Sequence, residues 1–134
     1  MNTLVLKSPR DGSLLTFEIR ARRRDEIEFD LVVKTPRFAG VVSASTFMVQ
    51  SPADLFREMA DEWTGWKEEK TWSDLERNVT IAATSDSTGH VSLHIVLDGQ
   101  DGDSLLRVRL EFEAGQLQSI ASEIASLFQD GAAD

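Results

Sequence analysis

The sequence of 134 residues predicts an α+β fold, a two-layer domain in which two helices pack on one face of a mainly antiparallel sheet of about six strands. Three observations predict it. Apolar and polar residues alternate along several segments, as in strands with one covered and one wet face. Two other segments repeat apolar residues every three or four positions, as amphipathic helices do. The element order β-β-β-(β)-α-β-β-β-α packs most simply as one sheet beneath two helices.

The first half of the chain contains the earlier strands. Residues 15–19 and 27–33 show clear apolar–polar alternation, and the small and β-branched residues of 38–47 favour a third strand. The short apolar run 3–6 is suited to pairing at a sheet edge. Four arginines in the stretch 20–24 are followed directly by acidic residues, so we expect a salt-bridged hairpin tip there.

A helix is predicted over about residues 52–64. Ser51 is a suitable N-cap, and Pro52 fits the first helical position. The apolar stripe of this segment includes Trp63, which we therefore expect in the core. Gly65 is placed to end the helix in a left-handed conformation.

The second half repeats the alternation three times and then ends in a helix. Residues 78–84, 90–97 and 106–112 alternate as in an antiparallel meander, and residues 116–128 carry an apolar stripe. We expect one α+β domain over residues 1–128, because a chain of this length supports one core. Residues 129–134 are small and polar, so a flexible C-terminal tail is predicted.

Composition limits the classes of function. The chain has no cysteine, no apolar run of membrane-spanning length and no signal-peptide pattern, so we expect a cytoplasmic protein without membrane contact. Its 23 acidic and 14 basic residues give a formal charge of −9. Nucleic-acid binding depends on basic groups and is therefore not expected. The acidity serves solubility, or it matches the field of a basic protein partner.

No catalytic, cofactor-binding or metal-binding constellation is recognisable. His90 and His94 lie four positions apart in a predicted strand, hence about 13 Å apart, which is too far to share a metal. The charged residues that follow the first predicted helix are expected to be exposed to solvent rather than to form a pair of catalytic carboxylates. We therefore expect a protein that is not an enzyme and uses no cofactor.

The most distinctive stretch holds all three tryptophans within residues 63–72. Large aromatic side chains at a connector either lock it against the core or anchor a partner. The acidic residues after the tryptophans and the polar residues on the wet face of the sheet are further candidates for binding. The residues predicted to contact a partner are Trp66, Trp72, Asp74, Glu76, His94, Glu28 and Asp30.

Three motifs carry a resemblance to a known family. They are Trp-x-Gly-Trp in residues 63–66, Thr-Trp-x-x-Leu-Glu in 71–76 and Thr-x-Asp-x-x-Gly-His-Val in 84–91. Over residues 38–128 the chain resembles a family of small actinobacterial proteins of unknown function, which implies no activity or site residues. In its architecture alone, the chain is also similar to the immunity proteins of bacterial toxin systems. Those proteins are often acidic and act by binding a toxin.

The sequence therefore favours a non-enzymatic protein-binding module, of the immunity type that neutralises a basic toxin, existing as a monomer or weak homodimer. The alternative is a small-molecule-binding protein or enzyme with a pocket between the Trp66–Trp72 connector and the sheet. A third hypothesis is a homo-oligomer paired through an edge strand.

Overall fold

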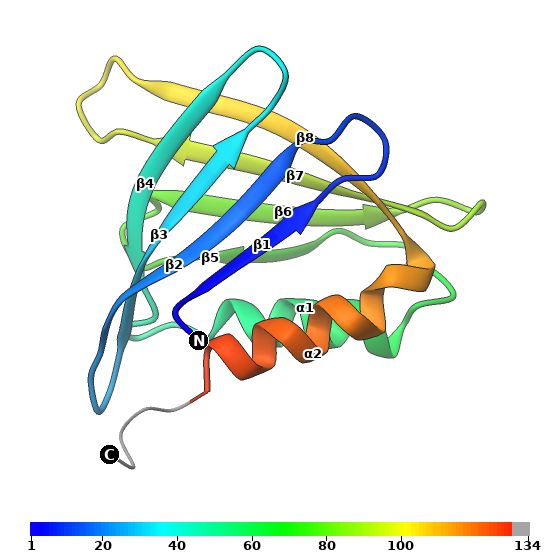
Figure 1. The fold of residues 1–134 in the computed structure, drawn as a ribbon, viewed down its shortest axis with the longest axis horizontal. Helices are drawn as coiled ribbons and strands as arrows, with labels where there is room; N and C mark the ends of the chain where they lie inside the picture. The colour runs from blue at the N-terminus through cyan, green and yellow to red at the C-terminus, as the bar shows by residue number, and fades with distance from the viewer. Residues whose placement is uncertain (130–134) are drawn as a thin grey trace.

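The computed structural model describes residues 1–129, which form two antiparallel sheets of four strands each and two α-helices (Figure 1). The N-terminal sheet has the order β1-β2-β3-β4, and the C-terminal sheet has the order β5-β6-β7-β8. The elements are β1 (Thr3–Lys7), β2 (Leu14–Arg22), β3 (Ile27–Lys34), β4 (Ala39–Ser45), α1 (Pro52–Asp61), β5 (Lys70–Ser73), β6 (Val79–Ser85), β7 (His90–Asp98), β8 (Leu105–Glu113), the 3₁₀ turn η1 (Ala114–Gln116) and α2 (Leu117–Leu127).

The α+β class is confirmed, but the single sheet of about six strands is wrong. Residues 1–129 form eight strands in two sheets. The strand missing from the prediction is β5, which has four residues and buries only Trp72, so it shows no alternation to detect. The division into two sheets could not be predicted from the sequence either. The alternation of apolar and polar residues shows which side of a strand is buried, but it does not show which strands pair.

The two halves of the chain share one topology. Each is a meander of four strands followed by a helix, and α1 and α2 lie side by side at one end of the molecule (Figure 1). The amide of Gln118 in α2 donates to the carbonyl of Ala60 in α1 at 3.0 Å. Strand β4 packs across β6 and β7, so the two sheets meet along this edge.

Both sheets and both helices contribute to one cluster of buried residues. Its aromatic centre joins Phe17 and Phe29 of the N-terminal sheet to Phe56, Trp72 and Phe128. The ring of Phe29 lies 5.1 Å from that of Phe128 and 5.9 Å from that of Trp72. Since burying such a side chain contributes about 1.5–3 kcal/mol, these contacts bind the two halves strongly together.

The first helix begins as predicted and ends earlier. Ser51 accepts a hydrogen bond from the backbone N–H of Ala53 at 3.1 Å and so caps α1. The helix stops at Asp61, and turns carry the chain to Gly65, whose φ is 123°. Trp63 therefore leaves the apolar stripe and is 55% exposed, so its predicted core position is wrong.

The arginines of the β2–β3 hairpin make two kinds of contact, which are salt bridges within the hairpin and hydrogen bonds to other segments. Arg20 pairs with Asp30 and Arg23 with Glu28, which confirms the predicted salt bridges at this tip. Arg22 instead donates to the carbonyl of Leu127 at 2.6 Å, at the end of α2, and to that of Met1 at 2.8 Å. Of the tail predicted for 129–134, residues 130–134 lie outside the described residues.

Candidate binding site

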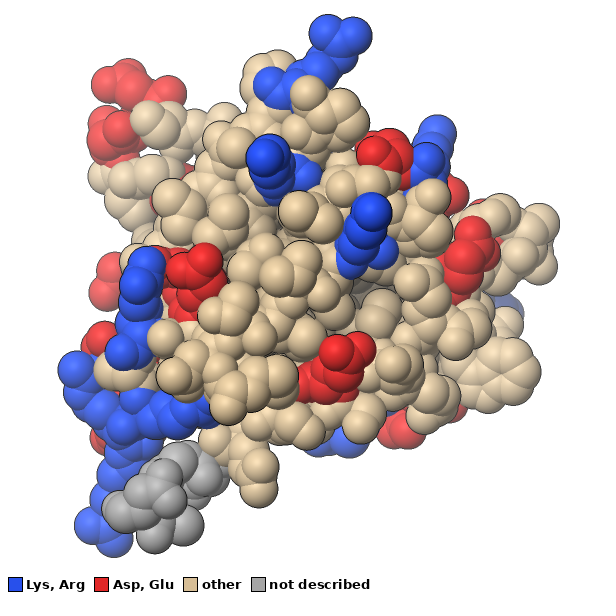
Figure 2. Space-filling view, in the orientation of Figure 1, with Lys and Arg blue, Asp and Glu red and all other residues tan. Residues whose placement is uncertain are grey.

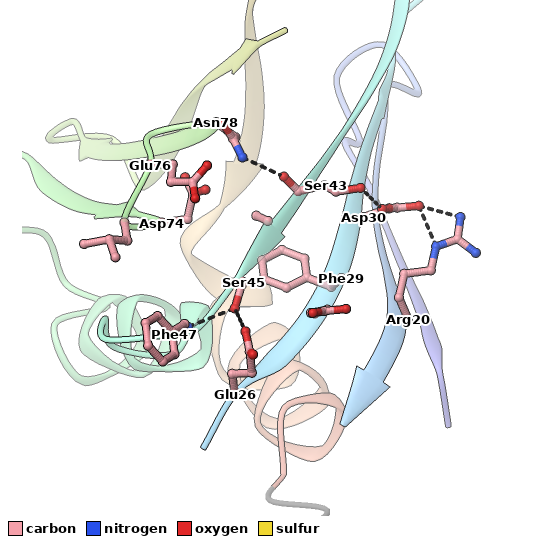
Figure 3. A pocket seen from close by; sticks show the side chains of 13 residues that line it. Arg20, Glu26, Phe29, Asp30, Ser43, Ser45, Phe47, Asp74, Glu76 and Asn78 are labelled. Carbon is pink, nitrogen blue, oxygen red and sulfur yellow. Dashed lines mark hydrogen bonds and ion pairs between the residues drawn. The ribbon is translucent and has the colours of Figure 1, made fainter. Parts of the chain in front are cut away.

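A cavity of about 420 Å³ lies between β4 and the loop that joins β5 to β6 (Figure 3). Its wall takes residues from β2, β3 and β4 on one side and residues 74–78 on the other. The ionisable residues that line it are Arg20, Glu26, Glu28, Asp30, Asp74 and Glu76. Five carboxylates thus face one guanidinium, and the site has a strongly negative character.

Apolar side chains form the rest of the wall. Phe29 and Ala44 are buried and continue into the core. Phe47 and Leu75 also line the cavity, and they are 42% and 55% exposed. A ligand in this cavity would therefore meet both carboxylates and an apolar surface, including the aromatic ring of Phe47.

Asp30 is already neutralised within the protein. Its carboxylate accepts hydrogen bonds from the hydroxyl of Ser43 at 2.5 Å and from Nε of Arg20 at 2.6 Å. Burial alone would raise the pKa of Asp30, but these hydrogen bonds and the charge of Arg20 together hold it below its usual value. Asp30 therefore stays ionised and orders this part of the wall.

Asp74 has a different environment. It is only 5% exposed, and its carboxylate accepts the backbone N–H of Val79 at 3.0 Å. It forms no ion pair with any residue among 1–129. Burial raises the pKa of Asp74 despite the backbone N–H donors, and the nearby charge of Glu76 acts in the same direction. A cation placed beside Asp74 would relieve this penalty.

Glu76 is the most available carboxylate of the site. It is exposed, and among residues 1–129 its side chain makes neither an ion pair nor a hydrogen bond. Its backbone carbonyl accepts from the side chain of Gln100 at 3.1 Å, which holds the loop in place. The side chains of Asp74 and Glu76 both come from the β5–β6 loop and lie near one another in Figure 3.

Asn78 joins the loop to the opposite wall. Its side-chain N–H donates to the carbonyl of Ser43 in β4 at 3.2 Å, while its Oδ1 is buried and has no hydrogen-bond partner in the structure described. Also in β4, the hydroxyl of Ser45 donates a hydrogen bond to the carboxylate of Glu26 at 2.5 Å and accepts one from the backbone N–H of Phe47 at 3.0 Å. These contacts fix the β4 side of the cavity.

Four of the seven residues predicted for partner binding line this one cavity. Glu28 and Asp30 lie on β3, whereas Asp74 and Glu76 lie on the loop after β5. The fold brings the two pairs together from opposite halves of the chain.

The remaining three predicted residues lie outside the cavity. Trp72 is 5% exposed, packs on Phe29 and donates its indole N–H to the carbonyl of Gln50 at 2.5 Å. Trp66 is half-buried and donates its indole N–H to the carbonyl of Ala83 at 3.2 Å. Both tryptophans therefore have structural roles. His94 is exposed on the outer face of β7.

Several lining residues escaped the sequence prediction. Glu26 and Arg20 were assigned only to the hairpin tip, and Ser43, Ser45 and Asn78 carry no recognisable pattern. Their roles depend on the meeting of β4 with the β5–β6 loop. The usable signals were the acidic residues near the end of the tryptophan-rich stretch and the two acidic residues that alternate with buried residues of β3.

Among residues 1–129, no group of three or more histidine, aspartate or glutamate side chains is arranged to hold a metal ion. No helix in the same range is long and apolar enough to cross a membrane.

Comparison with known proteins identifies a family without an assigned activity. Residues 6–131 match the profile of a family described as "Family of unknown function (DUF6228)". No curated protein matches the chain.

Two solved structures match the chain at low similarity. One is from the crystal structures of Trypanosoma brucei MRP1/MRP2, with 18% identity over 91% of this chain and 81% of that chain and a TM-score of 0.48. The other is the siderocalin Ex-FABP, described as functioning through dual ligand specificities. It shows 9% identity over 84% of this chain and 68% of that chain, with a TM-score of 0.31. At these values neither similarity carries an argument about function.

Proposed function

Because the chain belongs to this family of unknown function, which brings no activity with it, we propose a function from the geometry of the site: a protein-binding module whose acidic cavity receives a basic segment of a partner protein. The proposal assigns no catalytic residue, cofactor or metal, and its partner is neither a nucleic acid nor a membrane. The chain acts by occupying its partner's surface rather than by chemistry.

The observation that supports this proposal most directly is the imbalance of charge in the cavity. Glu26, Glu28, Asp30, Asp74 and Glu76 line it, and Arg20 is the one basic lining residue among those described. Asp30 is satisfied by Arg20, and Glu28 pairs with Arg23. The carboxylate of Glu26 accepts the hydroxyl of Ser45, whereas Asp74 and Glu76 have neither an ion pair nor a hydrogen bond from another side chain among residues 1–129, so these two are the groups most available to a cation.

The site favours an arginine or lysine side chain over a free metal ion. A guanidinium group forms paired hydrogen bonds with carboxylates, and it also stacks on aromatic faces such as that of Phe47. The alkyl part of such a side chain would lie against Leu75 and Ala44. The overall charge of −9 would speed the encounter with a basic partner.

A titration with a fluorescently labelled peptide of ten arginines tests the proposal. We expect binding at low salt, and we expect the double variant Asp74→Asn/Glu76→Gln to weaken it at least tenfold, since the two unpaired carboxylates are lost. The measurement is fluorescence anisotropy, with a neutral glycine–serine peptide of equal length as the baseline.

The matched control is Glu68→Gln/Glu69→Gln. These two glutamates are exposed in the connector and do not line the cavity, yet their replacement changes the net charge by the same amount. We expect this control to change the dissociation constant less than twofold. Equal weakening by both double variants would mean that the peptide responds to overall charge, and the proposed site would be rejected.

The finer form of the proposal is an immunity-type protein that neutralises a basic toxin. The support is the acidic charge, the cavity and the architectural similarity noted from the sequence. Calorimetry with the product of a toxin gene adjacent to the gene for this chain would measure the complex. A tight, salt-sensitive complex that blocks the toxin is expected. The absence of any complex at low salt would count against the immunity role.

A second candidate function is the binding of a small cationic molecule. It is favoured by the cavity volume of about 420 Å³, which lies within the usual range for small-ligand sites. The cavity lies beyond the end of the Trp66–Trp72 connector rather than beneath it. Calorimetry with spermidine and with arginine amide would separate the two candidates, because a protein-binding site needs the peptide context for useful affinity.

A further inference from the structure

Two β-turns, one from each half of the chain, contribute side chains to the acidic cavity. The first turn spans Thr46–Val49 and the second spans Asp74–Arg77. In each, the backbone N–H of the last residue donates to the carbonyl of the first, at 3.2 Å and 3.1 Å respectively. Phe47 and Leu75 are central residues of these turns, and both line the cavity.

The central positions of both turns hold large apolar residues that are open to water. Phe47 is 42% exposed, Met48 is 77% exposed and Leu75 is 55% exposed. Glycine, proline, asparagine, aspartate and serine dominate such positions in proteins. Met48 also has a φ of 59°, a left-handed backbone that glycine or asparagine adopts more readily than methionine does. The chain therefore exposes apolar side chains here at a cost in stability.

These apolar side chains border the acidic groups of the cavity. Leu75 lies between Asp74 and Glu76 in the sequence, and all three residues line the cavity. Figure 3 shows Phe47 at the end of the cavity beyond Asp74 and Glu76. On the face over the N-terminal sheet, by contrast, acidic and basic side chains are interspersed around a broad uncharged area (Figure 2). The union of available carboxylates with an exposed apolar border is thus a feature of the cavity and not of that face.

The chemistry of this border limits what can occupy it. A segment of arginines alone would satisfy the carboxylates but would leave Phe47 and Leu75 partly in water. Since consecutive α-carbons lie about 3.8 Å apart, a side chain that covers Leu75 must stand within one or two residues of the side chain that reaches Asp74. Burial of these apolar groups would add affinity that salt does not screen.

We propose that the partner's segment is amphipathic: next to its arginine or lysine it carries a large apolar residue, which packs on Phe47 and Leu75. This inference rests on the acidic cavity being the binding site, as proposed above, and it adds a second determinant of specificity. The carboxylates select a cation, and the apolar border selects the cation's neighbour in the partner's sequence.

Two labelled peptides of equal charge test the proposal by fluorescence anisotropy. One contains three Arg-Leu pairs separated by Gly-Ser, and in the other serine replaces each leucine. We expect the leucine peptide to bind at least fivefold more tightly at low salt. At about 0.5 M salt, where charges are screened over roughly 4 Å, only the leucine peptide should retain measurable binding.

A pair of leucine variants isolates the contribution of the apolar border. Leu75→Ser should weaken binding of the leucine peptide at least fivefold and of the serine peptide less than twofold, because it removes part of the border and keeps both carboxylates. The matched control is Leu105→Ser on β8, since this side chain is 52% exposed and does not line the cavity. The control should change neither dissociation constant, and circular dichroism confirms that each variant is folded.

The outcomes separate this inference from the function on which it rests. If Asp74→Asn/Glu76→Gln weakens binding of both peptides while Leu75→Ser affects the two peptides equally, the acidic site stands and the apolar determinant is overturned. If the double variant weakens neither peptide, the proposed site fails, and this inference fails with it. Self-association of the free chain that Leu75→Ser abolishes, measured by sedimentation velocity, would assign the border to a second copy and would also overturn the proposal.

Discussion

Among single residues, Asp74 has the environment most consistent with a binding role. Its carboxylate is buried and accepts the backbone N–H of Val79, yet no positively charged side chain among residues 1–129 pairs with it. Structural carboxylates are normally compensated, as Asp30 is by Arg20 and Ser43. An uncompensated one lowers stability unless a ligand offsets its charge.

This environment predicts a pH-dependent gain from Asp74→Asn. Because burial raises the pKa of Asp74, the folded state holds the proton more tightly than the unfolded chain, and stability falls as the pH rises from the unfolded value through the folded one. The amide of asparagine keeps an acceptor for Val79 without the charge. At pH 7 we expect the Tm of the variant to be about 2–4 °C higher, which corresponds to roughly 1 kcal/mol.

Thermal unfolding monitored by circular dichroism at pH 7 and at pH 3 measures the effect. The difference should vanish at pH 3, where Asp74 is protonated in both states. Glu69→Gln is the control, since this side chain is exposed and lies outside the cavity, and it should leave the Tm unchanged at both pH values. A lower Tm for Asp74→Asn at pH 7 would show that the backbone donors outweigh the burial.

At the scale of elements, the arginine-rich tip of the β2–β3 hairpin forms the local salt bridges predicted from the sequence, and it also contacts α2 and the N-terminus. Arg22 reaches from the end of β2 to the last carbonyls of α2 and to the N-terminus. Cationic donors at the C-terminal end of a helix satisfy its free carbonyls and complement the helix dipole. The hairpin therefore fastens α2 to the N-terminal sheet.

We expect Arg22→Met to lower the free energy of unfolding by about 1 kcal/mol, because it removes charged hydrogen bonds in a partly exposed place while keeping the aliphatic packing. Urea denaturation followed by tryptophan fluorescence provides the value. Arg24→Met is the matched control, since Arg24 is exposed and forms no ion pair or side-chain hydrogen bond among residues 1–129. Equal destabilisation by both variants would contradict the role assigned to Arg22.

For the whole molecule, the two halves repeat one topology but share one core. Phe17 and Phe29 of the first half pack on Phe128, and Phe29 also packs on Trp72. Neither half can bury these rings alone. The repeated topology is therefore not a pair of independent folding units.

This shared core predicts that fragments 1–69 and 70–134 do not fold separately, whereas the full chain unfolds in one cooperative transition. Circular dichroism and the dispersion of amide signals in NMR spectra would be measured for each fragment alone and for an equimolar mixture. A fragment with a cooperative melting transition of its own would refute the prediction.

Part of the candidate site could be predicted from the sequence. The acidic residues of 74–76 were identified because they follow the tryptophan-rich stretch, and Glu28 and Asp30 because they alternate with buried residues of β3. Nothing in the sequence placed these two pairs in one cavity. Trp63 was misplaced because the end of α1 depends on how the chain leaves it for β5, and helix periodicity does not show this.

By itself, the sequence determined the α+β class, the capped start of α1, seven strand segments and the outward side of most strands, because side-chain periodicity and capping are local properties. Only the tertiary structure decided that β5 exists, that the strands divide into two sheets, and that β4 meets the β5–β6 loop. Strand pairing depends on packing between segments far apart in the chain. The cavity lies where these segments meet, so it is a property of the fold.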